Sequence, residues 1–161
     1  MKSSPVGSWT LETKEAPWTP RDSMGHIVYD GKMWILGGFI PQRVNDVWSS
    51  SDGIEWSRAT EEAPWAVRNL PNCVVFDDKM WIMGGLNANG FQRADGSTPY
   101  WKVPHYSDIW NSSDGINWNL VIEDAPWGKK RSLFAIEFNG KLWMIGGWSP
   151  THGYTNDMWS S

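Results

Sequence analysis

One seven-residue phrase occurs three times in this chain, and no other feature constrains the fold as strongly. Each copy begins with a lysine, continues as a run of large apolar side chains and closes with two glycines; the copies span residues 32–38, 79–85 and 141–147. An apolar run of this length is typical of a strand buried on both faces. A glycine pair at its end indicates positive φ angles or the close approach of another backbone. Three copies predict a repeat architecture.

The chain has 14 tryptophans, and twelve of them fall into four columns with one member in each repeat. The second column always follows the first by nine residues, and the third follows the second by sixteen. Such regular spacing indicates equivalent positions in successive structural units. In column order the tryptophans are Trp9, Trp56 and Trp118; Trp18, Trp65 and Trp127; Trp34, Trp81 and Trp143; and Trp48, Trp110 and Trp159.

Each unit is predicted to hold four short strands. The second strand is the glycine-terminated phrase, and a tight turn pair such as Asn139-Gly140 joins it to the first. A Ser-Ser-Asp-Gly turn precedes the fourth strand, which begins near Trp56 or Trp118. The aspartate of this turn is expected to accept backbone N–H bonds, and its glycine to take a positive φ. The first strands are predicted at residues 25–29, 73–76 and 134–138, and the third strands at 45–49, 107–111 and 156–160.

This order of elements resembles the kelch repeat of β-propellers. The glycine pairs and downstream tryptophans carry the resemblance, together with Arg21, Arg68 and Lys130, which follow the second-column tryptophans by three residues. One departure is the tryptophan in the third strand, where many kelch repeats have tyrosine. The resemblance covers nearly the whole chain and implies an all-β fold of four-stranded antiparallel blades, three per chain. We expect a single domain, 1–161, with units at about 9–55, 56–117 and 118–161.

The predicted strand series does not begin with the first strand of a unit or end with the fourth strand of one. The chain begins with a fourth strand around Trp9 and ends with a third strand around Trp159, so the third unit lacks its fourth strand. An open half-ring exposes a strand edge and apolar faces, and the resemblance implies a ring of six blades. We therefore predict a head-to-tail homodimer in which each N-terminal strand completes the last blade of the other copy. The alternative is a fragment or engineered half of a longer chain.

The loops between second and third strands vary in length and are predicted to share one face of the ring with the crossovers between units. The longest is residues 86–106. Long loops on a rigid scaffold are where binding usually resides, and aromatic, Arg, Asn and His side chains can stack on sugar rings or hold a carboxylate. Each aromatic can equally pack the insertion onto the scaffold, and each arginine can tie down a crossover. The candidate ligand-binding residues are Arg21, Arg68, Asn87, Arg93, Tyr100, Trp101, His105, Trp148 and His152.

These features predict a non-catalytic binding or scaffold module for a carbohydrate or protein ligand. One alternative is an enzyme, because some kelch-like rings resemble sugar epimerases or mutarotases; the sequence offers no paired acid and base for it. Another is a designed or minimal half-propeller without a selected ligand.

The charge and the sequence motifs argue against nucleic-acid-binding, membrane-spanning, metal-binding and cofactor-binding proteins. A net charge of −4 gives no basic field for nucleic acid. No apolar stretch is long enough for a membrane helix, and the N-terminus lacks a signal-peptide apolar region, which predicts a cytoplasmic location by default. Cys73 is expected to be a small buried residue. The three histidines lack metal-binding spacing and no phosphate or dinucleotide motif occurs, so no metal or cofactor is predicted.

Overall fold

The computed structural model describes residue 7 and residues 9–91, 93, 95–97 and 99–161. In this part of the chain there are eleven β-strands and no helix, and hence no helix long and apolar enough to span a membrane. The strands form two four-stranded sheets and one three-stranded sheet, and every pairing is antiparallel. The all-β prediction is therefore confirmed.

Within each sheet the strands follow one another in chain order. The predicted strands 25–29 and 134–138 coincide with β1 and β9, while β6 stops before its glycine pair. The first sheet holds β1 (Gly25–Tyr29), β2 (Lys32–Phe39), β3 (Arg43–Ser50) and β4 (Ser57–Thr60). The second holds β5 (Asn72–Phe76), β6 (Lys79–Met83), β7 (Ile109–Ser112) and β8 (Asn119–Ile122). The third holds β9 (Phe134–Phe138), β10 (Lys141–Ser149) and β11 (Gly153–Ser160).

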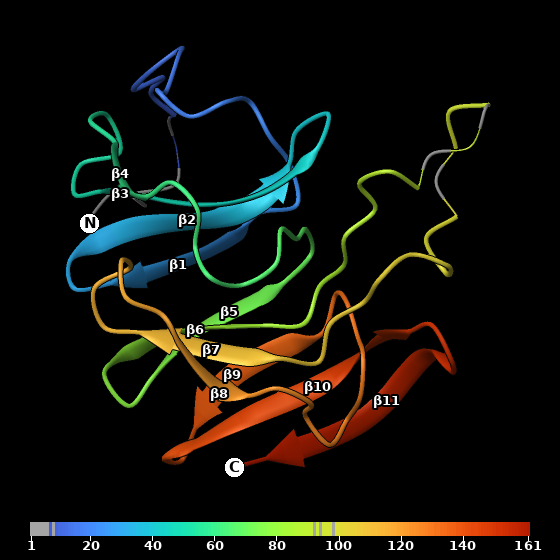
Figure 1. Cartoon of the computed structure of the whole chain (residues 1–161). Coiled ribbons are helices and arrows are strands. Elements are labelled where there is room, and N and C mark those ends of the chain that lie inside the picture. Colours follow the sequence, from blue (N-terminus) through green and yellow to red (C-terminus); the bar gives the residue numbers. More distant parts are fainter. Residues whose placement is uncertain (1–6, 8, 92, 94, 98) are drawn as a thin grey trace.

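The three sheets lie one after another, with the first strand of each sheet next to the first strand of its neighbour (Figure 1). Strand β5 contacts both β1 and β9. The β2–β3, β6–β7 and β10–β11 connections all project at the right-hand end of the sheets in Figure 1. The variable loops therefore share one face of the molecule, as predicted; we call it the loop face.

The glycine pairs are explained by both reasons that the sequence suggests. Gly37 has a φ of 59° and Gly84 a φ of 62°, a region that side-chain-bearing residues rarely adopt. A Cβ on Gly84 would lie 2.6 Å from the carbonyl oxygen of Lys130, and one on Gly37 would lie 3.0 Å from that of Arg68. The crossover that leads to the next unit thus passes directly against the first two glycine pairs.

The core lies between the sheets. One cluster joins Trp34 and Val47 of the first sheet to Met80 and Ile82 of the second. Cys73 packs against this cluster, and burial raises the pKa of its thiol to about 12. A second cluster lies between the second and third sheets and includes Met83, Ile109, Ala125, Leu133, Leu142 and Met144.

The predicted N-terminal strand is not formed in the single chain. Residues 9–12 have no strand pairing, and Trp9 is 91% exposed; Ser8, the first residue of that predicted strand, lies outside the described residues. The predicted pairing needs a second copy of the chain, so the six-bladed ring stays a prediction at this point.

Candidate functional site

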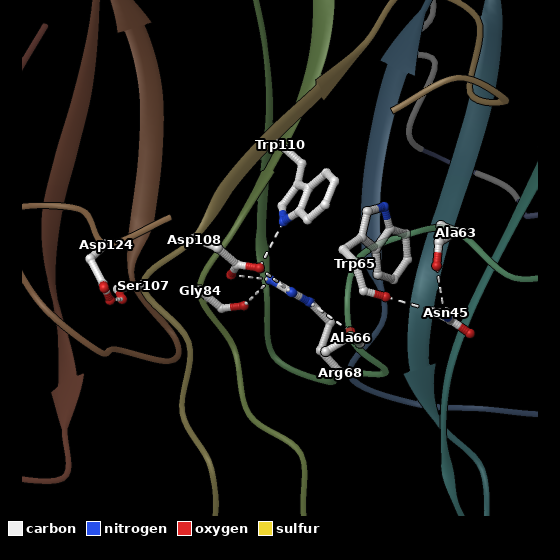
Figure 2. A network of polar contacts seen from close by, with 10 residues as sticks. All are labelled: Asn45, Ala63, Trp65, Ala66, Arg68, Gly84, Ser107, Asp108, Trp110 and Asp124. Atoms are coloured by element: carbon white, nitrogen blue, oxygen red, sulfur yellow. Dashed lines mark hydrogen bonds and ion pairs between the residues drawn. The ribbon is translucent and has the colours of Figure 1, made fainter. Parts of the chain in front are cut away.

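A basic side chain and an aspartate form the same ion pair once in each repeat. In the second repeat, shown in Figure 2, Arg68 Nη2 lies 2.7 Å from Asp108 Oδ2 and Nη1 donates to Oδ1 at 2.8 Å. Arg68 also donates to the carbonyl oxygens of Gly84 and Ala66, and Trp110 Nε1 donates to Asp108 at 2.7 Å. We call this arrangement the clamp; its other two copies are Arg21–Asp46 and Lys130–Asp157.

The clamp ties each crossover to the sheet that follows it. Arg68 uses four of its five N–H groups on protein acceptors, and the side chains of Arg21 and Arg68 are buried. The hydrogen bond from Lys130 holds the pKa of Asp157 well below its usual range. The structure thus places Arg21 and Arg68 in the scaffold, the second of the two roles that the sequence left open.

A second group of side chains gathers on the loop face. We call Arg43, Tyr100, His105, Arg131 and Trp148 the loop-face cluster. The backbones of Arg131 and Trp148 pair in both directions at 3.0 Å. The Arg131 guanidinium carbon lies 4.5 Å from the Trp148 ring centroid and 5.8 Å from that of Tyr100. Its Nε is buried without a hydrogen-bond partner, and among the described residues Arg131 makes no ion pair.

Arg43 brings a second cation to the cluster at the start of β3. It is buried, its Nε donates to Asn69 Oδ1 at 3.2 Å, and its guanidinium carbon lies 4.4 Å from the Phe39 ring centroid. Burial lowers the pKa of Arg43, and the neighbouring Tyr100 acts in the opposite direction. An arginine remains charged at neutral pH even so, so the cluster holds two positive charges.

His105 lies beneath Trp148, with ring centroids 5.2 Å apart. Its Nδ1 lies 2.8 Å from the carbonyl oxygen of Val103; since a carbonyl only accepts, Nδ1 carries the proton and Nε2 is a free acceptor in the neutral ring. Burial lowers the pKa of His105, and the charges of Arg131 and Lys129 lower it further. Nε2 is buried and has no partner in the described part of the chain.

The other candidates have contacts of their own. Asn87 Oδ1 accepts the backbone N–H of Asn89 at 2.9 Å, which shapes the insertion. The Arg93 guanidinium carbon lies 5.5 Å from the ring centroid of Trp101, which is exposed. His152 is exposed as well. In the residues that the structure describes, no group of three or more His, Cys, Asp and Glu side chains could hold a metal ion.

Sequence reasoning missed Arg43 and Arg131 as site residues. The signal for Arg131 was available, because it directly follows the clamp lysine and pairs with Trp148, the residue after a glycine pair. Asn69 holds the same position in the second repeat and pairs with Leu86. Extending the strand pairing past each glycine pair would have placed Arg131 beside Trp148 and Asn69 beside Leu86.

No family model and no curated protein matches the chain. Among solved structures, that of YjhT is similar to it with a TM-score of 0.67 and 16% sequence identity. The match covers 89% of this chain and 43% of the YjhT chain. At this identity the likeness concerns the fold alone: the chain has the fold of part of YjhT and spans less than half of its length.

Proposed function

We propose that the chain is a non-catalytic binding module whose loop-face cluster binds a carboxylate carried by a sugar ring or a peptide. The observation that carries the proposal is Arg131, a guanidinium stacked on Trp148 with no ion pair among the described residues. Arg43 adds a second cation to the cluster, near Tyr100. Two positive charges that both lie near Tyr100 favour the binding of an anion beside that residue.

The chemistry of the cluster suits a ligand with both a charge and a flat face. Guanidinium groups bind carboxylates through paired N–H bonds, with a geometry that lysine cannot supply. Tyr100 is exposed and offers an aromatic face for stacking. His105 Nε2 is a buried acceptor without a partner among the described residues. A side-chain movement that exposes this atom would let it accept a hydrogen bond from a ligand hydroxyl or amide.

The scaffold is proposed to be a kelch-like half-propeller. The three antiparallel sheets with adjacent first strands support this proposal, as does the likeness to part of YjhT. The clamps hold each crossover on its sheet, so the loop face rests on rigid elements, as a binding face requires.

A sugar epimerase or mutarotase is supported less well. Such a reaction needs an acid and a base placed together. In the cluster only His105 has a side chain of the type that commonly serves as acid and base. Burial lowers the pKa of His105, and its Nδ1 is held by the carbonyl oxygen of Val103. An acceleration of anomer interconversion by the protein, followed by NMR, would contradict the non-catalytic proposal.

Isothermal titration tests the proposal with four probes. Galacturonate is compared with galactose, and a tripeptide with a free carboxyl terminus is compared with its amide. We expect one of the two carboxylates to bind and both neutral partners to fail; which carboxylate binds distinguishes a sugar from a peptide ligand. Failure of both carboxylates, or equal binding of a neutral partner, contradicts the proposal.

The matched variants are Arg131→Gln and Arg58→Gln. Arg58 pairs with Glu61 on the surface of the first sheet, away from the cluster. Losing a charged hydrogen bond costs about 1.5–3 kcal/mol, so R131Q should weaken binding roughly tenfold to hundredfold while R58Q leaves it unchanged. Equal affinities of the two variants would exclude Arg131 as a ligand contact.

A further inference from the structure

We propose that residues 9–12 of a second copy of this chain complete the third sheet, and that Trp9 of that copy fills an apolar groove between the second and third sheets. The groove has a volume of about 310 Å³. Its lining includes Trp81, Ile109, Ile122, Trp127, Met144 and Trp159. The proposal is independent of any ligand on the loop face.

The tryptophan pairs identify the occupant. At the start of the first sheet Trp18 packs edge-to-face on Trp56, with ring centroids 5.9 Å apart. Between the first and second sheets Trp65 packs in the same way on Trp118, again at 5.9 Å. Each pair joins a second-column tryptophan to the first-column tryptophan that comes next in the series. Trp127 is the next second-column member, and Trp9 is the first-column tryptophan that makes no such pair among the described residues, so we assign Trp9 of a second copy to Trp127.

The groove corresponds, by repeat position, to the junction between the first and second sheets, which Trp118 fills. Repeat positions equate Trp81, Ile109, Trp127 and Met144 of the groove with Trp34, Val47, Trp65 and Ile82. The latter four are buried in one cluster, and Trp118 is buried among them. An apolar cavity of about 150 Å³ is enough to hold benzene, so the groove has room for an indole.

The strand register extends the same equivalence to the backbone. Strand β3 pairs with β4 through Trp48↔Arg58 and Ser49↔Ser57, and β7 pairs with β8 through Trp110↔Leu120 and Asn111↔Asn119. Strand β11 pairs with β10 on one edge, and no described residue pairs with its other edge. By repeat position, residues 159 and 160 should therefore pair with residues 11 and 10 of the second copy.

The two ends of the sheet series are apolar and exposed. Phe138 and Met158 of the third sheet correspond to Tyr29 and Val47, which pack in the first cluster. At the opposite end, Val28 of the first sheet is exposed too. Exposed apolar faces of this kind mark interfaces, and two copies joined head-to-tail cover both ends at once.

The likeness to YjhT fits a two-copy assembly. The match covers 43% of the YjhT chain, so that chain is long enough to hold the matched arrangement twice. The second copy would supply the other half of a closed arrangement, and each copy would complete the third sheet of the other.

The mass in solution, measured by light scattering on a sizing column, tests the proposal. We expect wild-type protein at twice the chain mass of 18.3 kDa. Trp9→Ala should shift it to the single-chain mass, whereas Trp101→Ala, which alters an exposed loop tryptophan, should leave the dimer intact. A wild-type monomer overturns the proposal, and so does a W9A variant that remains dimeric; neither result affects the carboxylate titration.

A disulfide across the predicted pairing tests the register. Directly opposed residues in an antiparallel pair have Cα atoms about 4.5–5.5 Å apart, within the range of a disulfide. The double variant T10C/S160C should give a covalent dimer on a non-reducing gel, and neither single variant should. Cys73 is the chain's sole native cysteine, so both the double and the single variants carry Cys73→Ala to remove any competing thiol. A double variant that stays monomeric on the gel overturns the pairing.

Discussion

The junction between the first and second sheets and the junction between the second and third are built from equivalent residues, but only the first is filled. At the first, Trp118 is 7% exposed and packs edge-to-face on Trp65. At the second, Trp127 packs against Trp159 with ring centroids 6.3 Å apart, and the groove stays open. The tryptophan columns alone therefore do not complete a junction; the fourth strand of the following sheet does.

The clamps show the same contrast. The two side chains of the Arg68–Asp108 pair are 0% and 17% exposed, whereas those of Lys130–Asp157 are 4% and 38% exposed. The second clamp lies in a sheet with four strands and the third in a sheet with three. Among the described residues, the apolar junction and the polar clamp are thus both more open at the three-stranded sheet than at the four-stranded one.

The largest expected effect is a difference in the free energy of unfolding between tryptophan variants at the two junctions. Trp118→Ala should lower the free energy of unfolding by about 3–5 kcal/mol, because it leaves a cavity in a closed core. Trp127→Ala should cost clearly less, since Trp127 is half-buried beside an open groove. Urea unfolding followed by circular dichroism measures both. If a second copy fills the groove, the two costs should converge as the protein concentration rises; equal costs at every concentration would contradict the comparison.

The next effect compares the clamps. Arg68→Ala leaves Asp108 without its buried partner, which typically costs about 3–5 kcal/mol. In a Trp9→Ala background, which is expected to keep the chain single, Lys130→Ala should cost nearer to about 1 kcal/mol, as for exposed ion pairs, because Asp157 reaches water. Urea unfolding at neutral pH measures both variants. A K130A cost as large as that of R68A would show that the third clamp is as closed as the second.

Much of the fold could be predicted from the sequence because it depends on short-range rules. Apolar runs, turn pairs and glycine pairs predict β1 and β9 at their observed bounds. The Asp52 turn forms as expected, with Oδ1 accepting the N–H groups of Ile54 and Glu55. These features recur with a period, so each repeat supports the interpretation of the others.

The candidate site was less predictable because it joins residues without a period. Tyr100 comes from the insertion, and only the folded course of that loop brings it near Arg43 and Arg131. Arg21 and Arg68 have the residue types of a ligand site, yet clamp aspartates take up their hydrogen bonds. Residue type alone therefore does not distinguish a buried structural arginine from one available to a ligand.

A smaller effect compares the turns that precede β4 and β8. Gly53 and Gly115 both have positive φ, of 80° and 74°. Alanine at either position should cost about 1–2 kcal/mol for the backbone conformation. Gly115→Ala should cost about 1–3 kcal/mol more through overpacking, because its Cβ would strike the Trp34 ring; at Gly53 it meets just the flexible tip of Met33. Thermal unfolding measures the difference, and equal costs would show that Trp34 moves freely.

The smallest expected effect is the loss of stability at low pH, when the aspartates of the two turns become protonated. Hydrogen bonds from the backbone N–H groups of Ile54 and Glu55 lower the pKa of Asp52. At Asp114 burial raises the pKa, but the backbone and side-chain N–H groups of Asn117 and other hydrogen bonds outweigh it and bring the value to about 2. Because these folded-state pKa values lie below the unfolded value of about 4, each aspartate stabilises the fold fully above that pH. The contribution of Asp114 is lost as the pH falls from about 4 to about 2.

The two turns differ at one residue, and that residue accounts for the larger lowering of the pKa at Asp114 than at Asp52. Asn117 donates its side-chain amide to Asp114 at 2.8 Å, whereas Glu55 holds the same position beside Asp52 and has no such donor. Asn117→Ala should therefore raise the pKa of Asp114 toward that of Asp52, while Glu55→Ala should not raise the pKa of Asp52. Carboxyl carbon NMR titration measures both. An unchanged Asp114 midpoint in N117A would mean that the backbone N–H groups alone set the acid response, and that the two turns are electrostatically equivalent.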